Sequence, residues 1–266
     1  LPATATDTAA VAAALERVQS TRRFRVLDED FDLEAALDHP LESWRVFLHP
    51  TQRRLAEKTT RGPTRVLGAA GTGKTVVAMH RAVNLVRNLL PKDARVLFTT
   101  FTVNLAADIA RQLAKLATAD ELSRIEVIGV DRLASRIARE EGLDARPAMD
   151  TSKLWREAID VYGDGPWDLE LYRAEWADVV QAQDLRDERA YLRAKRFGRG
   201  TRLTRVERKA IWPVFARYRE LLDEHGLVEM GDLLRFAQRA VEAAPEKHRY
   251  DAVVVDEAQD MSAPAL

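Results

Sequence analysis

Residues 68–75 read Gly68-Ala69-Ala70-Gly71-Thr72-Gly73-Lys74-Thr75 and match the pattern G-x-x-x-x-G-K-S/T in full. The stretch 64–67 before them predicts a strand, and the sequence after them predicts a helix from Thr75 to Leu90 that ends at Pro91. In this context the pattern indicates a phosphate-binding loop, because glycines let backbone N–H groups converge on phosphate oxygens beside a helix N-terminus. The alternative is a glycine-rich turn that only joins strand to helix.

A nucleotide bound at this loop would be held by charge, by hydrogen bonds and through a metal ion. Lys74 would reach the β- and γ-phosphates, and the hydroxyl group of Thr75 would bind magnesium. We expect the whole loop to contact the nucleotide, that is Gly68, Ala69, Ala70, Gly71, Thr72, Gly73, Lys74 and Thr75. The sequence therefore predicts a nucleotide site with a Mg²⁺ ion.

The order of strand and helix patterns predicts an α/β fold. Further strands are expected at 95–99, 125–130 and 252–255, and a helix at 104–117 lies between the first two. This alternation implies a parallel sheet with helices on both faces, in which ligands bind at the carboxyl ends of the strands. Between about 135 and 225 the alternation stops, and a Trp-, Arg- and Glu-rich sequence predicts an inserted, mainly helical subdomain.

The composition is that of an ordinary globular protein. Hydrophobic residues make up 46% and charged residues 31%, with a net charge of −1, so any nucleic-acid signal must be local. The chain has no cysteine, which excludes disulfides, thiol catalysis and zinc–thiolate sites and fits a cytoplasmic protein. No apolar run approaches the roughly 20 residues of a membrane span. Both ends look cut, and we expect the chain to be part of a longer protein.

An apolar run that ends in two acids lies near the end of the sequence, Val253-Val254-Val255-Asp256-Glu257. Such a run is typical of a central strand buried on both faces. Two adjacent carboxylates at its tip need a compensating charge, which a magnesium ion supplies. We expect Asp256 to hold the metal and Glu257 to orient and deprotonate the attacking water. The alternative is an ordinary strand followed by an acidic turn.

The tetrad Asp256-Glu257-Ala258-Gln259, followed by Asp260, resembles motif II of superfamily 1 helicases, in particular of the UvrD/PcrA/Rep group. The run His49-Pro50-Thr51-Gln52 resembles the Q-motif of that family, in which Gln52 would read the adenine edge. This resemblance implies a P-loop RecA-like fold that binds ATP and Mg²⁺. It also implies that Val76 lies near the base, where many members have an arginine. The catalytic residues that it implies are Lys74, Asp256, Glu257 and Gln259.

The resemblance covers residues 45–266 and predicts a division of the chain. Residues 1–44 would form an N-terminal helical extension and linker, and 45–135 the first part of the RecA-like domain 1A. Residues 136–225 would form the inserted helical subdomain 1B, and 226–266 the second part of domain 1A. The run Met230-Gly231-Asp232-Leu233-Leu234 resembles the element that leads into motif II, although an ordinary amphipathic helix explains its residues equally well.

The stretch 97–107 resembles motif Ia, the strand-to-helix turn that touches single-stranded DNA. Phe101 would stack on a base and Thr102 would bond a phosphate. The alternative for Phe101 is a core side chain at the end of a strand. Residues 103–104 read Val-Asn where the family usually has Asn-Lys, and 127–132 stand at motif Ib without its usual Thr-Phe-His. The predicted contacts here are Thr100, Phe101, Thr102 and Asn104.

A basic stretch follows in the predicted insertion, with one acid among seventeen residues. Its cations are Arg193, Lys195, Arg196, Arg199, Arg202, Arg205, Arg208 and Lys209. Gly198 and Gly200 predict a loop in the middle. Charge of one sign favours phosphate contact, and we expect Arg196 and Arg199 to grip a nucleic-acid backbone. The alternative is a charged surface balanced by the acids in 184–188.

The resemblance implies a motor that uses ATP to translocate 3′-to-5′ along single-stranded DNA and to unwind duplex at a single-strand/double-strand junction. Such motors alternate two RecA-like domains around one ATP, and the second would lie in the missing part of the same parent chain. Arginines of that second domain stabilise the transferring phosphoryl group. We therefore expect this chain to bind Mg-ATP, to hydrolyse it very slowly and not to unwind DNA.

Three alternatives stay open from the sequence. One is a superfamily 1 motor that acts on RNA or moves 5′-to-3′. The second is a P-loop kinase or signalling NTPase, for which the sequence shows no acceptor site or switch element. The third is a non-catalytic, ATP-gated nucleic-acid binding module, against which the intact Lys74, Thr75, Asp256 and Glu257 argue.

Overall fold

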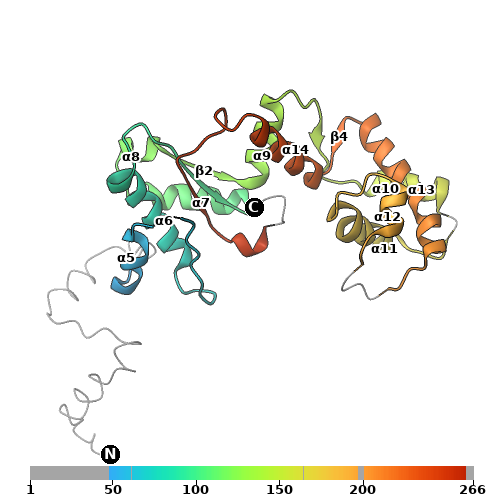
Figure 1. Ribbon diagram of the computed structural model, residues 1–266, viewed down its shortest axis with the longest axis horizontal. Coiled ribbons are helices and arrows are strands. Elements are labelled where there is room, and N and C mark those ends of the chain that lie inside the picture. Colours follow the sequence, from blue (N-terminus) through green and yellow to red (C-terminus); the bar gives the residue numbers. More distant parts are fainter. Residues whose placement is uncertain (1–47, 61, 164, 197–200, 262–266) are drawn as a thin grey trace, which may run out of the picture.

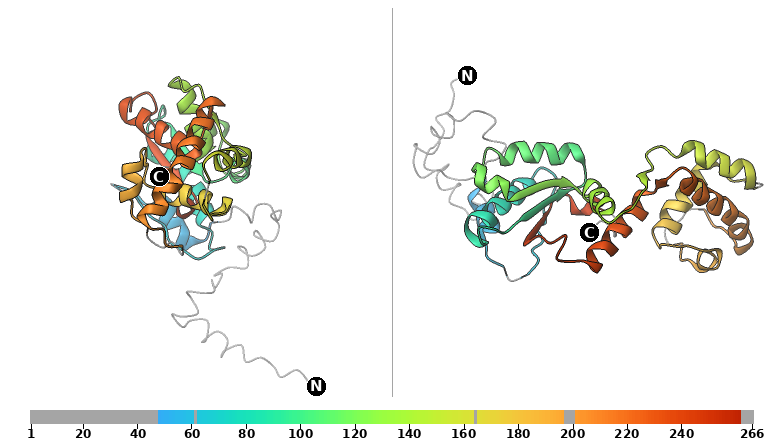
Figure 2. Two further views of the ribbon diagram at one scale, coloured as in Figure 1. Left: turned by 90° about the vertical axis from the view of Figure 1, so that its right-hand side faces the viewer. Right: turned by 90° about the horizontal axis from the view of Figure 1, so that it is seen from above.

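The computed structural model describes residues 48–60, 62–163, 165–196 and 201–261. They form an α/β part and a helical lobe beside it (Figures 1 and 2). The predicted N-terminal extension, 1–44, lies outside the described residues.

The α/β part is built on a parallel sheet with the strand order β2-β1-β5. Its strands are β1 (Val96–Thr100), β2 (Ile125–Gly129) and β5 (Ala252–Val255). In the pairing register, Val96 of β1 lies beside both Ile125 and Ala252. All five residues of β1 are buried, so β1 is the centre of the described sheet. The predicted parallel sheet is confirmed, with each of these three strands within one residue of its predicted bounds.

Helices pack on both faces of this sheet, although one face of β5 stays exposed. On the face of Phe98 pack α6 (Lys74–Asn84), its π-helical continuation η1 (Leu85–Leu89) and α7 (Val103–Leu113). On the other face α9 (Val130–Glu140) places Arg136 against Glu126 of β2, and α14 (Met230–Ala243) packs on α9. The short α8 (Ala119–Ser123) leads into β2, and α5 (Pro50–Glu57) packs on α6. The helix predicted after the glycine-rich loop is confirmed, whereas α7 ends four residues before its predicted end.

Two predictions about strands are wrong. Residues 64–67 form no strand, and Leu67 is 76% exposed. A strand needs a neighbour for its backbone N–H and C=O groups, and no described strand pairs with this stretch. The second error concerns β5, which is an edge strand of the described sheet rather than a central one. Its burial alternates along the chain, with Val253 55% exposed.

The helical lobe is formed by α10 (Ser152–Tyr162), α11 (Leu169–Glu175), the π-helical η2 (Trp176–Gln181), α12 (Glu188–Arg193) and α13 (Arg205–Glu224). Its core is aromatic: Trp155 stacks on Tyr218 with the ring centroids 3.8 Å apart, and Phe215 meets Trp155 edge-on. The predicted mainly helical insertion is confirmed. At residue 136, its predicted start, the chain is still within α9, which runs to Glu140 and packs on α14 of the α/β part.

The chain crosses between the α/β part and the helical lobe twice, and the two crossings pair with each other. They are the short parallel strands β3 (Arg146–Pro147) and β4 (Leu227–Val228). After α14 the chain enters β5 and then the 3₁₀ turn η3 (Ala258–Asp260). No helix in the described part of the chain is long and apolar enough to cross a membrane.

Candidate nucleotide-binding and nucleic-acid sites

The glycine-rich loop turns sharply into the first residue of α6. Gly71 and Gly73 have φ angles of 75° and 79°, in the left-handed region that favours glycine. A Cβ atom on Gly73 would also lie 3.0 Å from Nε2 of Gln52, so the end of the Gln52 side chain would have to shift. The loop lies on the surface, at the N-terminus of α6, where free backbone N–H groups favour an anion.

Lys74 folds back over this loop. Its Nζ atom donates to the carbonyl oxygens of Gly68 and Ala69, both at 3.1 Å. The same Ala69 oxygen accepts a bond from the Thr72 hydroxyl group at 2.8 Å, which closes the turn. The ammonium group thus lies within the curve of the loop, where phosphate oxygens could replace the two carbonyl oxygens as acceptors.

The second helical residue, Thr75, meets the tip of β5. Its Oγ1 atom donates to Oδ2 of Asp256 at 2.8 Å, although the two residues are 181 positions apart. Asp256 is held there by its own backbone N–H group, which donates to the carbonyl oxygen of Thr99 on β1 at 2.9 Å. The fold therefore brings the predicted metal-binding hydroxyl and carboxylate together.

The carboxyl group of Asp256 has a raised pKa. The residue is only 5% exposed, and this burial is the main cause. The hydrogen bond from Thr75 lowers the pKa, and the charge of neighbouring Glu257 raises it again. A buried carboxylate that repels its neighbour favours a cation, as a metal site requires.

Thr75 and Asp256 fit a magnesium ion that shares its ligands with a nucleotide. Mg²⁺ binds one or two protein oxygens and takes its other ligands from phosphates and water. The described residues contain no group of three or more His, Asp or Glu side chains that could hold a metal by themselves. The protein thus offers two oxygen ligands, and the phosphates of a nucleotide would complete the set.

Glu257 has a backbone conformation that is rare for its residue type. Its φ angle is 53°, in the left-handed region, which costs a non-glycine residue about 1–3 kcal/mol. Gln259 donates from Nε2 to a carboxylate oxygen of Glu257, and from the same atom to Asp260 at 3.3 Å. Strain of this kind concentrates at functional sites. The predicted catalytic carboxylate and Gln259 are therefore direct neighbours.

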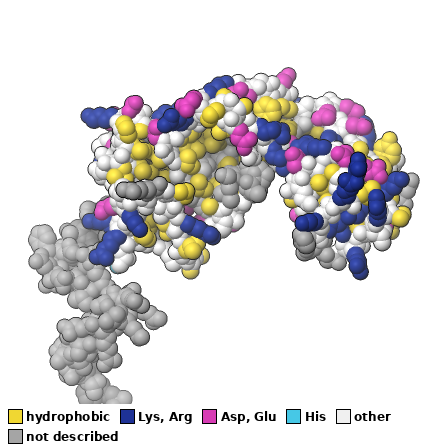
Figure 3. All heavy atoms as spheres, in the orientation of Figure 1, with side chains coloured by type: hydrophobic (Ala, Val, Ile, Leu, Met, Phe, Trp, Pro, Cys, Tyr) yellow, Lys and Arg dark blue, Asp and Glu magenta, His cyan; other side chains and the backbone are white. Residues whose placement is uncertain are grey.

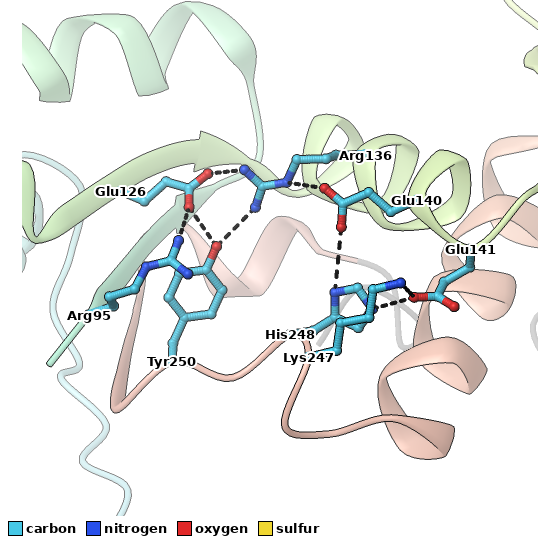
Figure 4. Close-up of polar contacts among 8 residues, drawn as sticks. All are labelled: Arg95, Glu126, Arg136, Glu140, Glu141, Lys247, His248 and Tyr250. Carbon is cyan, nitrogen blue, oxygen red and sulfur yellow. Dashed lines mark hydrogen bonds and ion pairs between the residues drawn. The ribbon is translucent and has the colours of Figure 1, made fainter.

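A cluster of polar side chains that includes Arg95, Glu126, Arg136 and Tyr250 lies at the opposite end of β5 (Figure 4). Asp251 and Arg95 exchange two bonds: the Asp251 N–H group donates to the Arg95 carbonyl oxygen at 2.9 Å, and the Arg95 N–H group donates to Oδ2 of Asp251 at 2.8 Å. The Tyr250 hydroxyl group donates to Glu126 at 2.6 Å and accepts from Arg136 at 2.9 Å. A shift of one residue would turn Asp256 to the other face of the sheet, so these bonds help to place it.

Comparison with known proteins identifies the family. A family profile described as the UvrD/REP helicase N-terminal domain matches residues 48–265. The chain belongs to the UvrD/Rep helicase family. The family membership that the motifs indicated is confirmed.

Curated relatives of the family are distant and longer. The chain is 28% identical over 218 residues to the ATP-dependent DNA helicase PcrA of Leuconostoc citreum, which covers 77% of this chain and 28% of that protein. It is 27% identical over 234 residues to a probable DNA helicase II homolog of Rickettsia felis (80% and 33%). It is also 27% identical over 231 residues to the ATP-dependent DNA helicase UvrD2 of Mycobacterium bovis (79% and 32%). The chain spans about a third of the length of these relatives.

The glutamine that resembles the family's Q-motif is bonded to the glycine-rich loop. Nε2 of Gln52 donates to the Thr72 carbonyl oxygen at 2.8 Å, and its Oε1 accepts from the His49 N–H group at 3.1 Å, so both ends of the amide are used. Contact with adenine stays a prediction, and it would require Nε2 to leave Thr72. Val76 is half-buried and packs against the cluster of Leu48 and Ala56. Its place beside the base likewise stays a prediction.

The residues that resemble motif Ia divide into exposed and buried ones. Phe101 is 45% exposed, and Thr102 and Asn104 are exposed beside it. Thr102 also caps α7, accepting the Leu105 N–H group at 3.2 Å. The prediction for Thr100 is wrong for this structure, because its side chain is fully buried at the end of the central strand β1. Only the exposed residues could meet a nucleic acid.

The structure also corrects the prediction for Arg196. Its guanidinium group is bidentate on Glu175, with Nε at 2.7 Å and Nη2 at 2.8 Å, while Nη1 donates to the Thr201 carbonyl oxygen at 3.0 Å. The Arg196 side chain is 11% exposed and Glu175 is fully buried, so the pair belongs to the lobe interior. Arg208 is similarly engaged, with its guanidinium over the Tyr191 ring at 4.9 Å. Arg199, the other predicted contact, lies outside the described residues.

Other cations of the basic stretch do reach the surface. Arg193, Lys195, Arg202, Arg205 and Lys209 are exposed. Figure 3 shows Lys and Arg side chains gathered on the visible face of the helical lobe. The sequence does not show this division between interior and surface, since the buried partner Glu175 lies 21 residues before Arg196 and has no motif around it. The surface cations are better candidates for phosphate contact than Arg196.

Proposed function

We propose that this chain is the ATP-binding part of a DNA helicase motor, and that its parent protein uses ATP to translocate 3′-to-5′ along single-stranded DNA and to unwind duplex. The contact between Thr75 and Asp256 at 2.8 Å carries the proposal, because it joins the glycine-rich loop to the acidic strand tip at one point. Family membership supports the same function. The named relatives are DNA helicases, which favours DNA over RNA.

The chain's own residues would act on the nucleotide in defined ways. Phosphate oxygens would take the Lys74 ammonium group from the carbonyl oxygens of Gly68 and Ala69. Glu257 would leave Gln259 and orient a water for attack on the γ-phosphate. Thr75 and Asp256 would hold the magnesium ion, which neutralises charge on the β- and γ-phosphates when it is bound. Phe101 would stack on a base of the single strand.

The isolated chain should bind Mg-ATP and hydrolyse it very slowly. An arginine supplied by a second domain is worth about 10³–10⁵ in rate in comparable phosphoryl transfers. The chain spans about a third of its relatives' length, and we propose that a second RecA-like domain of the parent supplies such arginines. Rapid DNA-stimulated turnover by the isolated chain would contradict this part of the proposal.

The proposed activity is tested by ATP hydrolysis in the parent protein, with and without an oligo-dT single strand. We expect the single strand to stimulate turnover, and Glu257→Gln to abolish the stimulated rate. Glu246→Gln is a matched control, because Glu246 is an exposed surface acid outside the site. An absence of stimulation, or equal rates for the two variants, would overturn the proposal.

A further inference from the structure

Asp232, in the first turn of α14, is bonded to both the helical lobe and the α/β part. Its Oδ2 atom accepts from Nε2 of Gln181 at 2.9 Å, and its Oδ1 atom accepts from Nη2 of Arg186 at 2.6 Å. Nη2 of Arg235, one turn along α14, donates to the same Oδ1 at 3.0 Å. Gln181 and Arg186 belong to the helical lobe, so one carboxylate joins groups from both sides.

Arg235 extends this contact to the turn after η2. Its Nη1 atom donates to the Gln181 carbonyl oxygen at 2.8 Å, and its Nε atom lies 3.2 Å from Oδ1 of Asp184. Asp184 has a φ angle of 50°, a left-handed conformation that the turn requires. The turn that carries Asp184 and Arg186 is thus fastened directly to α14.

The same turn is fastened to the core of the helical lobe. Arg219 of α13 donates to the carbonyl oxygens of Leu185 at 3.1 Å and Arg186 at 3.3 Å. Its guanidinium group lies over the Trp176 ring at 5.0 Å from the centroid. A displacement of α14 relative to this turn would therefore disturb the packed interior of the lobe.

The paired crossings form a second attachment at a different place. The Arg146 N–H group donates to the Gly226 carbonyl oxygen at 2.9 Å, and the Ala148 N–H group donates to that of Val228 at 2.8 Å. The β3–β4 pair alone would let the helical lobe rotate about the axis of these two short strands. The bonds of Asp232 and Arg235 lie beside that axis and oppose the rotation. Gly231 allows the Gln181 side chain to lie close to α14, because a Cβ atom at position 231 would lie 2.8 Å from Oε1 of Gln181.

We propose that Asp232 is the positioning residue that fixes the orientation of the helical lobe on the α/β part. Two carboxylates, those of Asp232 and Asp184, each pair with both guanidinium groups of Arg186 and Arg235 and so offset their mutual repulsion, and of the two only Asp232 lies on α14. Without its charge, the direct bonds from Gln181 and Arg186 to α14 are weakened, and the lobe swings more widely about the β3–β4 pair, held on that side only by the contacts of Arg235 with Gln181 and Asp184 and by the Tyr218–Glu229 bond. Asp232 would fix this orientation whether or not the chain binds a nucleic acid.

The absence of cysteine allows a direct measurement of this orientation. Arg111 on α7 and Val206 on α13 are exposed, Val206 at 80%, and cysteines placed there can carry two spin labels. Pulsed electron spin resonance on the whole chain then gives the distribution of distances between the labels. We expect one narrow distribution for the labelled chain that keeps Asp232, and a clearly broadened or displaced one for Asp232→Asn. Asp160→Asn, an exposed acid on α10 of the same lobe, should leave the distribution unchanged.

Two further variants keep the test decisive if Asp232→Asn does not fold. Gly231→Ala displaces Oε1 of Gln181, which accepts a bond from Arg235, without removing a charge, and Arg186→Gln removes one bond from the lobe side. Both should broaden or displace the distribution while circular dichroism shows the parent helix content. Two results would overturn the proposal. One is a broad distribution for the chain that keeps Asp232, Gly231 and Arg186, and the other is a narrow, unshifted distribution for every folded variant of these three residues.

Discussion

The glycine-rich loop and the basic stretch of the helical lobe both stand out in the sequence, but only the first could be assigned residue by residue. In the loop, the role of each group follows from its place in eight consecutive residues and from one strand tip, where Thr75 meets Asp256 at 2.8 Å. In the basic stretch, the role of each cation depends on a partner elsewhere. Arg196 is buried on Glu175, whereas Arg202 is exposed. A run of cations therefore does not show which of them face the solvent.

The largest expected effect is the loss of stability on removing Glu175, the buried partner of Arg196 in the helical lobe. Glu175→Ala leaves the guanidinium group of Arg196 buried without its counter-charge, and it removes the acceptor of the Tyr191 hydroxyl group at 3.0 Å. We expect a loss of about 3–5 kcal/mol in the free energy of unfolding, measured by urea denaturation. Glu170→Ala, an exposed acid on the same helix, should change little. Equal effects of the two variants would mean that the buried pair is not needed.

A second prediction concerns Phe101, whose half-exposed ring lies at the carboxyl end of β1. Phe101→Ala should weaken binding of an oligo-dT strand by about 1–3 kcal/mol, the usual contribution of one stacked base. Phe101→Trp should retain the affinity, because it keeps an aromatic face. Fluorescence anisotropy titrations measure both. Unchanged affinity for Phe101→Ala would assign the ring to packing alone.

A third prediction separates the exposed cations from Arg196. Each lost phosphate contact reduces the slope of log affinity against log salt by about 0.7 for a single strand. The pair Arg202→Ala and Arg205→Ala should therefore lower the slope by about 1.4, if both contact phosphates. Arg196→Ala should lower the free energy of unfolding and leave the slope as it is. The reverse pattern would restore Arg196 as the phosphate contact.

The smallest of these effects is a change in stability on substituting Asp256. Burial raises the pKa of Asp256, and a raised pKa in the folded state means that ionisation of this carboxyl group destabilises the fold. The stabilising contribution is complete below the unfolded pKa of about 4 and is lost as the pH rises through the folded value. Asp256→Asn carries no charge and should raise the melting temperature by a few degrees at pH 7.

The gain from Asp256→Asn should disappear in melting experiments below about pH 4, where the carboxyl group of the parent sequence is protonated as well. A lower melting temperature at pH 7 would show instead that the hydrogen bond from Thr75 outweighs the cost of the buried charge.

Most of the fold could be predicted from the sequence, because its signals are local. The β-branched runs of β1, β2 and β5 and the apolar spacing of α7 lie within single elements. The strand predicted at 64–67 was wrong because strand formation depends on a neighbour, and the described sheet has none beside it. The prediction that β5 is buried on both faces was wrong because only the face of Ala252 and Val254 packs on the core, whereas Val253 and Val255 on the other face are exposed.

In the candidate site, too, local motifs could be predicted from the sequence, whereas features that depend on distant neighbours could not. Lys74, Thr75 and Asp256 were found from their motifs, whereas the burial of Thr100 depends on its place in the central strand. The contact that Asp232 makes with the helical lobe could not be predicted. Its partners Arg186 and Gln181 lie 46 and 51 residues away, in a loop and at a helix end that carry no motif.

The most direct test of the account is equilibrium binding of a fluorescent ATP analogue with magnesium to this chain. The chain should bind the analogue, and Lys74→Ala should lose most of the affinity, because Lys74 is the cation enclosed by the loop. Lys92→Ala removes an exposed lysine that follows the helix and should bind as the parent sequence does. Equal binding by all three proteins, or binding by none, would contradict the assignment of the loop as a nucleotide site in this chain.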